Sequence, residues 1–196
     1  MNPVSRLKSL EWAMFIRHPD YDRITETLTD ESDKGINAFA RKIKPHLLGD
    51  KQDSQVAIFH SWELRSFETA TALAWHLYEY KDRLPVFGLS CLSKTDYEDG
   101  VGQMNTVIDF LPDGVRGVII TNHNKAIPGI VGAFYHLITG EVIVCDVPDY
   151  GEGYLMDVAS GEITIGLQSH FARLDAAKKT NEEAKSRDLF GEDPGF

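Results

Sequence analysis

The chain has 196 residues, of which 42% are hydrophobic, and it carries a formal net charge of −10. This length and composition are typical of one globular domain with a substantial core. The negative charge argues against a general nucleic-acid binder or anionic-membrane binder, because both need a basic surface. No apolar run approaches the roughly 20 residues that cross a bilayer, and the short run after Arg6 and Lys8 disfavours a secretory signal. We therefore expect a cytoplasmic protein.

Strand-like and helix-like segments alternate from Trp12 onward. Apolar runs rich in β-branched and aromatic residues predict strands over residues 12–17, 55–61, 84–90 and 117–123. Apolar residues at helical spacing predict helices over residues 33–48, 64–80, 103–111 and 127–138. The two cysteines, Cys91 and Cys145, form no CxxC pair and predict buried, reduced thiols.

The C-terminal part is richer in strands. Three more strands are expected over residues 141–147, 153–158 and 162–166. The alternation before them predicts a three-layer α/β/α sandwich with a mostly parallel sheet and an antiparallel edge. We expect a single domain over residues 1–174. Residues 175–196 are polar and charged, and predict a short helix that frays into a partly disordered tail.

Polar side chains follow three of the expected strands at the point where each strand ends. They are Arg17 and His18; His60 and Ser61, with Arg65 one turn later; and Asn122, His123 and Asn124. In open parallel sheets ligands gather beyond the carboxyl ends of the strands, so these residues are expected to converge on one edge. Arginines and histidines together predict an anion site there, in a protein that is acidic overall.

Three motifs in this order resemble the histidine phosphatase superfamily, the phosphoglycerate mutase-like fold, and within it the short phosphohistidine phosphatases. The strand "MFIRHPD" resembles the family's Arg-His-Gly strand end, and "HSWELRSFETA" its Ser-Ser-x-x-x-Arg-x-x-x-Thr-Ala motif. "GVIITNHN" resembles its third strand, which ends in histidine. "LTDESDKGINAFA" and "GYLMDVASGEI" resemble its first helix start and its closing hairpin, so the similarity runs from Trp12 to Ile165.

The resemblance implies a role for four residues. It makes Arg17 and Arg65 the clamps of a phosphoryl group, for which the planar guanidinium is suited because it can hold two oxygens at once. It makes His18 the nucleophile that becomes transiently phosphorylated, and His123 the second histidine of the phosphate pocket. Histidine is largely neutral near pH 7, so a ring nitrogen can attack phosphorus without first losing a proton.

The sequence departs from the family pattern in four places. Pro19 follows the nucleophile where glycine is usual, and proline removes a backbone N–H and fixes φ. His60 stands at the usual first serine and either lines the pocket or packs in the core. The asparagine that many members carry after the first motif is absent from "DYDRIT". No acidic proton donor is evident, and the candidates are Asp96, Glu98 and Asp99 in "TDYEDG".

The missing donor bears on the substrate. A phosphoester leaving group benefits from a general acid, whereas a phosphoramidate such as phosphohistidine carries a protonatable nitrogen. We therefore expect a metal-independent phosphatase, without cofactor, that hydrolyses a phosphate monoester or phosphohistidine through a phosphohistidine intermediate on His18. The expected partner is a phosphorylated small molecule or a phosphohistidine protein.

Three alternatives remain open. The first is a non-catalytic phosphate-binding module of the same fold. The second is a phosphoglycerate mutase-type phosphotransferase, although the chain is short for a mutase and leaves little for a closing lid. The third is a metallohydrolase with His18, His60 and His123 as ligands. Against that, no HxH or HxxxH pair occurs, and the two arginines would repel a metal ion. Oligomeric state and pathway stay open.

Overall fold

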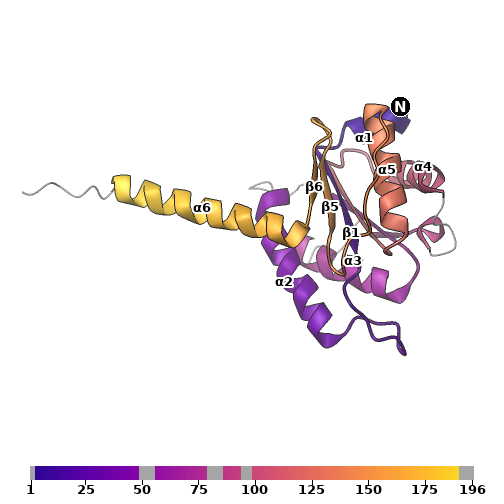
Figure 1. Ribbon diagram of the computed structural model, residues 1–196, viewed down its shortest axis with the longest axis horizontal. Helices are drawn as coiled ribbons and strands as arrows, with labels where there is room; N and C mark the ends of the chain where they lie inside the picture. Colours follow the sequence, from indigo (N-terminus) through magenta and orange to yellow (C-terminus); the bar gives the residue numbers. More distant parts are fainter. Residues whose placement is uncertain (1–2, 49–55, 79–85, 94–98, 190–196) are drawn as a thin grey trace, which may run out of the picture.

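The structure is a computed structural model that describes residues 3–48, 56–78, 86–93 and 99–189. Helices flank a six-stranded sheet with the strand order β3-β2-β4-β1-β5-β6 (Figure 1). The strands are β1 Trp12–Arg17, β2 Val56–His60, β3 Val86–Gly88, β4 Gly117–Asn122, β5 Gly153–Asp157 and β6 Ile163–Ile165. The helices are α1 Pro3–Lys8, α2 Asp30–Leu47, α3 Leu64–Tyr78, α4 Gly100–Phe110, α5 Ala126–Thr139 and α6 Leu167–Leu189, with a 3₁₀ turn η1 at Ser90–Leu92.

The sheet is mostly parallel with an antiparallel edge. The strand pairs β1–β4, β2–β4 and β2–β3 are parallel, whereas β5 runs antiparallel to β1 and to β6. Strands buried on both faces read as continuous apolar runs, and the "MFI" of β1 and the "VII" of β4 are buried throughout. The expected sheet is confirmed.

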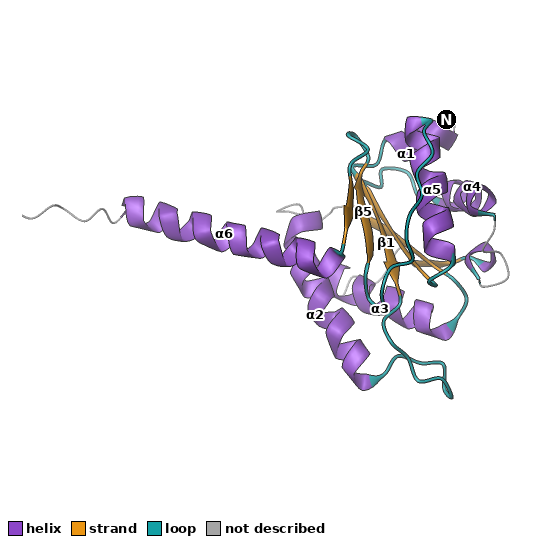
Figure 2. Cartoon of the chain, in the orientation of Figure 1, coloured by secondary structure: helices purple, strands orange, loops and turns teal. Residues whose placement is uncertain are grey.

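Side chains of the central strands alternate between two cores, one on each face of the sheet. Phe15, Phe59 and Ile120 pack on one face with apolar residues of α1, α4 and α5. Met14, Ile58 and Ile119 pack on the other with residues of α2, α3 and α6. Successive strand residues point to opposite faces, so each face receives its own helix layer (Figure 2). The three-layer sandwich is therefore confirmed.

Local sequence sets the start of α2. Thr29 is its N-cap, and the Thr29 side chain accepts a hydrogen bond from the Ser32 N–H. Three carboxylates in the first turn interact favourably with the positive end of the helix dipole and so stabilise the helix. The apolar spacing, whose first member is Ile36, predicted a helix from residue 33. These capping signals start the helix three residues earlier, at Asp30.

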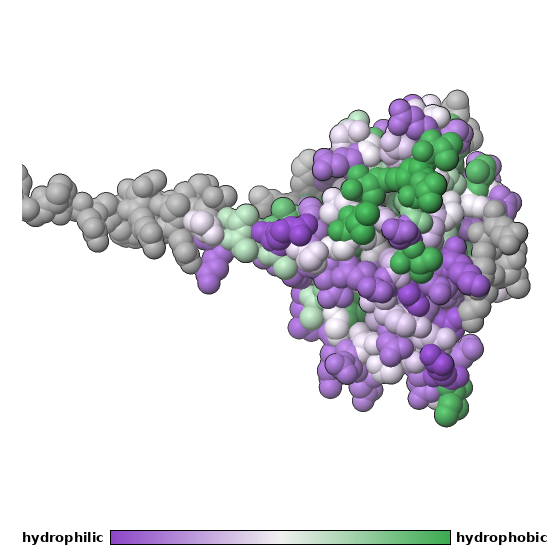
Figure 3. Space-filling view, in the orientation of Figure 1, coloured by the Kyte–Doolittle hydropathy of each residue, from purple (hydrophilic) through white to green (hydrophobic). Residues whose placement is uncertain are grey.

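Residues 141–147 do not form a strand, so that prediction was wrong. The next strand along the chain, β5, offers no free edge to these residues, because it already pairs with β1 on one side and β6 on the other. Val142 and Val144 instead point outward from an extended segment and are 84% and 94% exposed. Figure 3 shows the resulting hydrophobic patch over α5 and this segment.

The two ends of the chain also differ from expectation. Helix α1 was not predicted, and it packs Leu7 into the core beside α4 and α5. Helix α6 starts before the expected boundary at residue 174, is longer than the short helix predicted, and projects from the body (Figure 1). The last residues expected to be disordered, 190–196, lie outside the described residues.

Of the helices described, none combines the length and the apolar content that a membrane span requires. Cys91 and Cys145 are half-buried rather than fully buried, and neither is disulfide-bonded.

Candidate functional site

The strand ends that carry the predicted polar residues lie side by side. Arg17 at the end of β1 pairs in register with Asn122 at the end of β4, and His60 of β2 pairs with Thr121. The next residues along these strands are His18, His123 and Ser61. Parallel neighbours therefore deliver the two histidines to the same edge of the sheet. Their ring centroids are 5.2 Å apart.

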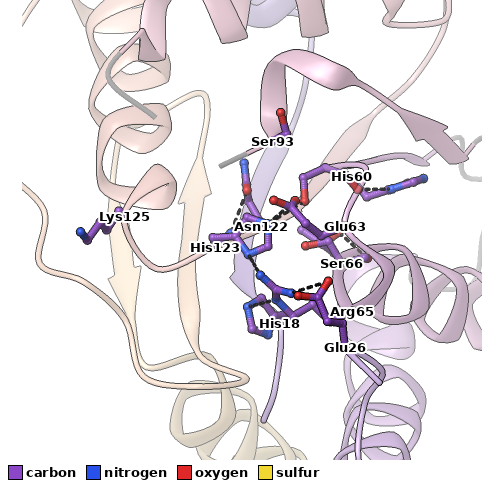
Figure 4. Close-up of polar contacts among 12 residues, drawn as sticks. His18, Glu26, His60, Glu63, Arg65, Ser66, Ser93, Asn122, His123 and Lys125 are labelled. Carbon is purple, nitrogen blue, oxygen red and sulfur yellow. Dashed lines mark hydrogen bonds and ion pairs between the residues drawn. The ribbon is translucent and has the colours of Figure 1, made fainter. Parts of the chain in front are cut away.

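The geometry defines the tautomer of His18, which is 3% exposed. Its Nδ1 lies 2.8 Å from the carbonyl oxygen of Pro19, which can only accept, so Nδ1 carries the proton. Its Nε2 accepts a hydrogen bond from Nε of Arg65 at 3.2 Å (Figure 4). Burial lowers the pKa of His18 to about 3 against the opposing Pro19 hydrogen bond, and the charges of His123, Arg65 and Arg17 lower it further. His18 is thus a neutral imidazole with its Nε2 lone pair aimed at a guanidinium.

The Arg65 side chain lies between the two histidines and is 1% exposed. Nε faces His18, and Nη2 lies 3.5 Å from Nδ1 of His123. The guanidinium carbon lies 4.4 Å from the ring centroid of Tyr21. Nη1 lies 3.9 Å from a carboxylate oxygen of Glu26, beyond hydrogen-bond range. Packing and hydrogen bonds therefore hold this cation in one orientation.

Arg17 adds a second cation to the site. Its Nη1 donates to the carbonyl oxygen of Pro148 at 2.9 Å, and its guanidinium carbon lies 3.7 Å from the ring centroid of Tyr150. Tyr150 also borders His18, with ring centroids 5.8 Å apart. The segment that follows α5 thus fixes the orientation of the Arg17 side chain.

Three buried donors at this edge have no hydrogen-bond partner among the residues that the structure describes. They are Nε of Arg17, Nη1 of Arg65 and Nδ2 of Asn122. A buried donor left unpaired costs about 1–3 kcal/mol, more when it is charged, so such groups need an explanation. An oxyanion beside His18 would supply acceptors for the two arginine donors. The arrangement therefore suits a tetrahedral anion beside Nε2 of His18.

Glu63 is a residue of this site that the sequence did not single out. Its carboxylate pairs with Nε2 of His123, which also lies 3.1 Å from Oγ of Ser61 (Figure 4). Both side chains are shielded, with exposed fractions of 15% for Glu63 and 3% for His123. Glu63 occupies a variable position between the first residues of its motif and Arg65, so the motif alone carries no signal for it. It places a carboxylate beside the two histidines, where the sequence motifs indicated no acidic residue.

Two of the departures from the family pattern have a structural outcome. Pro19 still provides the carbonyl that fixes the His18 tautomer, so the lost N–H leaves this contact intact. His60 points away from His18 and His123 (Figure 4). Its Nδ1 lies 2.7 Å from the carbonyl oxygen of Ser61, and its ring packs 5.4 Å from that of Phe67. Burial lowers the pKa of His60. We assign His60 to packing rather than to the pocket.

Of the three acid candidates, Asp99 alone lies in the part of the chain that the structure describes. Asp96 and Glu98 lie outside the described residues. Asp99 is exposed and is the N-cap of α4, where it accepts a hydrogen bond from the Gly102 N–H at 2.6 Å. Within the described ranges, no three His, Cys, Asp or Glu side chains are grouped to hold a metal ion. The three histidines of the metallohydrolase alternative do not converge, because His60 points away, and the other two each direct one ring nitrogen toward the Arg65 cation.

Comparison with known proteins supports the fold. No protein-family profile matches the chain, and no curated protein matches it. A structure of the protein histidine phosphatase SixA complexed with tungstate aligns with a TM-score of 0.54 and 17% identity, over 81% of this chain and 98% of that one. A protein described as a SixA phosphohistidine phosphatase from Agrobacterium tumefaciens aligns at 0.49 with 11% identity, over 76% and 92%. Phosphoglycerate mutase from Plasmodium falciparum aligns at 0.44 with 16% identity, over 79% and 87%. The fold of this chain is therefore that of the histidine phosphatases, the phosphoglycerate mutase-like fold that the sequence motifs indicated.

Proposed function

We propose that the protein is a phosphatase that forms a covalent phosphohistidine on His18. The observation that carries this proposal is the contact between Nε2 of His18 and Nε of Arg65, together with two buried arginine donors that have no hydrogen-bond partner in the described residues. A neutral nucleophile stands next to groups that can hold the oxygens of its target. The tungstate in the SixA structure is a tetrahedral oxyanion and is consistent with this reading.

The first step would transfer the phosphoryl group to His18. The two arginines would bind the phosphoryl oxygens and balance the charge that develops on them. Nε2 of His18 would form a bond to phosphorus while the bond from phosphorus to the leaving atom breaks, and that bonding pair would depart with the leaving group. Because His18 is already neutral with its proton on Nδ1, no proton needs to be removed before attack.

The pair of His123 and Glu63 would assist the transfer. A carboxylate beside an imidazole favours its protonated form, and Nε2 of His123 faces Glu63. Once Nη2 of Arg65 turns from Nδ1 of His123 to a phosphoryl oxygen, Nδ1 of a protonated His123 could donate to the phosphoryl group too. In the second step water would attack phosphorus, the P–N bond would break, and its electron pair would return to Nε2 of His18.

We further propose that the reaction needs no metal ion and that the substrate is a phosphate monoester or a phosphohistidine. The Arg65 guanidinium already provides positive charge between the two histidines, where a metal ion would be repelled. Arginine can hold two phosphoryl oxygens at once and so take the part that metal ions play in other phosphoryl transfers.

The test is hydrolysis of an aryl phosphate and of a phosphoramidate, in excess chelator, by the wild type and by His18→Ala. We expect turnover that persists in chelator and is lost in the variant. Turnover retained by His18→Ala would contradict the covalent role. Binding of phosphate or vanadate without turnover would identify a phosphate-binding module instead.

A further inference from the structure

A groove about 520 Å³ in volume runs between α2 and α3, next to the anion site. Its apolar lining includes Leu28, Phe67 and Trp75. Phe67 and Trp75 remain 45% and 48% exposed, which is high for side chains of this size. Exposed apolar surface rimmed by polar groups marks interaction sites.

The aromatic residues belong to a stripe along one face of α3. Leu64, Phe67, Thr71 and Trp75 are all exposed and recur at helical spacing. The opposite face of the same helix is buried against the sheet through Ala70, Leu73 and Leu77. Helix α3 therefore serves the core with one face and offers the other to a partner.

The polar lining of the groove is acidic. It contains Asp30, Asp33 and Glu68, and no lysine or arginine is among the described residues that line it. The Glu68 carboxylate accepts a hydrogen bond from the Leu28 N–H, and that of Asp33 accepts from Asn37. A basic side chain could reach these carboxylates and also lie over Trp75, since cations are attracted to the faces of aromatic rings. The charge of the groove is thus opposite to that of the anion site.

Two chain segments connect the groove to the anion site. Arg65 lies in the first turn of α3, whose exposed face lines the groove. Thr27 and Leu28 follow Glu26, whose carboxylate lies 3.9 Å from Nη1 of Arg65. At 1.5 Å of helix rise per residue, Trp75 lies about 15 Å along α3 from Arg65. An extended peptide spans about 3.3 Å per residue and covers that length in roughly four or five residues.

We infer that this groove binds a basic and apolar segment of a phosphorylated protein while the phosphorylated residue occupies the anion site. The inference rests on the proposed function and narrows its substrate to polypeptides with lysine or arginine about four or five residues from the phosphorylated position. The phosphate of the peptide would pair with the two arginines of the anion site. Its basic residues would pair with the carboxylates of the groove, and an apolar residue of the peptide would pack against Phe67.

The experiment measures binding and turnover separately. Fluorescence anisotropy gives the Kd of labelled peptides that carry a hydrolysis-resistant phosphohistidine analogue, with a Lys-Arg pair placed two, four, five or eight residues away. Peptides with a Glu-Glu pair at the same places serve as ligand controls. The proteins are the wild type, Trp75→Ala and Asp33→Asn, with Phe110→Ala and Asp109→Asn as matched variants of exposed residues on α4.

We expect the tightest binding at a spacing of four or five residues, a Kd raised about tenfold by Trp75→Ala, and a smaller loss with Asp33→Asn that fades at high salt. The α4 variants should match the wild type, and all five proteins should hydrolyse a small aryl phosphate equally. Equal binding of the Lys-Arg and Glu-Glu peptides would overturn the inference while leaving the phosphatase proposal intact. A concentration-dependent dimer of the wild type that Trp75→Ala abolishes would overturn it too, because another copy of the chain would then occupy the groove.

Discussion

The Nε atom of Arg65 donates to Nε2 of His18 across 3.2 Å, so the proposed clamp and the proposed nucleophile touch before any substrate binds. The neutral imidazole can accept this bond because burial and the nearby cations keep its pKa near 3. An entering phosphoryl group would replace the lone-pair contact with a bond to phosphorus while Arg65 turns its donors to the oxygens. One buried side chain would thus orient the nucleophile and bind its target.

Replacement of Arg65 by lysine should test this dual role. Lysine keeps the charge but loses the planar fork and the fixed Nε donor. We expect Arg65→Lys to lower kcat/KM for an aryl phosphate by roughly 100- to 1,000-fold, in the range seen when one donor to a transition-state oxyanion is removed. Arg116→Lys is the control, because Arg116 pairs with Glu11 and lies at the opposite end of β4. Equal activity of both variants would show that Arg65 has no special part.

Glu63 should matter through His123. Glu63→Gln keeps the shape but cannot favour a protonated imidazole, so the alkaline limb of the kcat/KM pH profile should move to lower pH. The rate with an aryl phosphate should fall about 10- to 100-fold, within the range of general acid–base effects, because His123 would lose the proton that it donates to a phosphoryl oxygen. Glu162→Gln, on an exposed residue before β6, is the control. A lower rate with an unshifted pH profile would reduce Glu63 to a structural role.

Glu26 should compete with substrate for Arg65. Its backbone is left-handed, with a φ of 59°, a conformation that non-glycine residues rarely adopt, and its carboxylate lies 3.9 Å from Nη1 of Arg65. An ion pair at this separation is worth about 1 kcal/mol in water. Glu26→Gln should therefore lower the inhibition constant of inorganic phosphate several-fold, whereas Glu31→Gln on the exposed surface of α2 should not. Unchanged inhibition in both would mean that the carboxylate does not compete.

The lowered pKa of His18 also predicts how stability depends on pH. The unfolded chain takes up a proton at this histidine below pH 6.5, whereas the folded chain resists protonation down to about pH 3. The free energy of unfolding should therefore fall as pH drops from 6.5 toward 3. His18→Gln removes this contribution, so urea unfolding between pH 7.5 and 4.5 should show a shallower loss than in the wild type. Parallel pH dependences would mean that His18 titrates normally in the fold.

Strand-end residues were predictable from the sequence because the sheet itself places them. β1, β2 and β4 are neighbours, so residues that follow them, such as His18 and His123, must meet at one edge. The motif order therefore indicated both the fold and the cluster. The sequence could not indicate the contact of Glu63 with His123, because it depends on the path of the turn between β2 and α3.

The sequence predicts less well the segments whose secondary structure depends on whether a partner strand has a free edge. Residues 141–147 have strong β-propensity, yet both sides of β5 are already paired, so propensity yields to the available edges. The same limit applies to His60, whose position in the motif left both the pocket and the core open. Its ring rotamer directs it toward Phe67, and a rotamer cannot be read from a motif.

The most direct test of the covalent mechanism is to trap the intermediate. Wild type is mixed with a ³²P-labelled phosphoramidate, quenched in alkaline detergent that preserves phosphohistidine, and digested for peptide mapping. The account predicts label on the peptide that contains His18, discharged by water during a chase, and absent from His18→Ala. Turnover by the wild type with no label on that peptide at any time would contradict it.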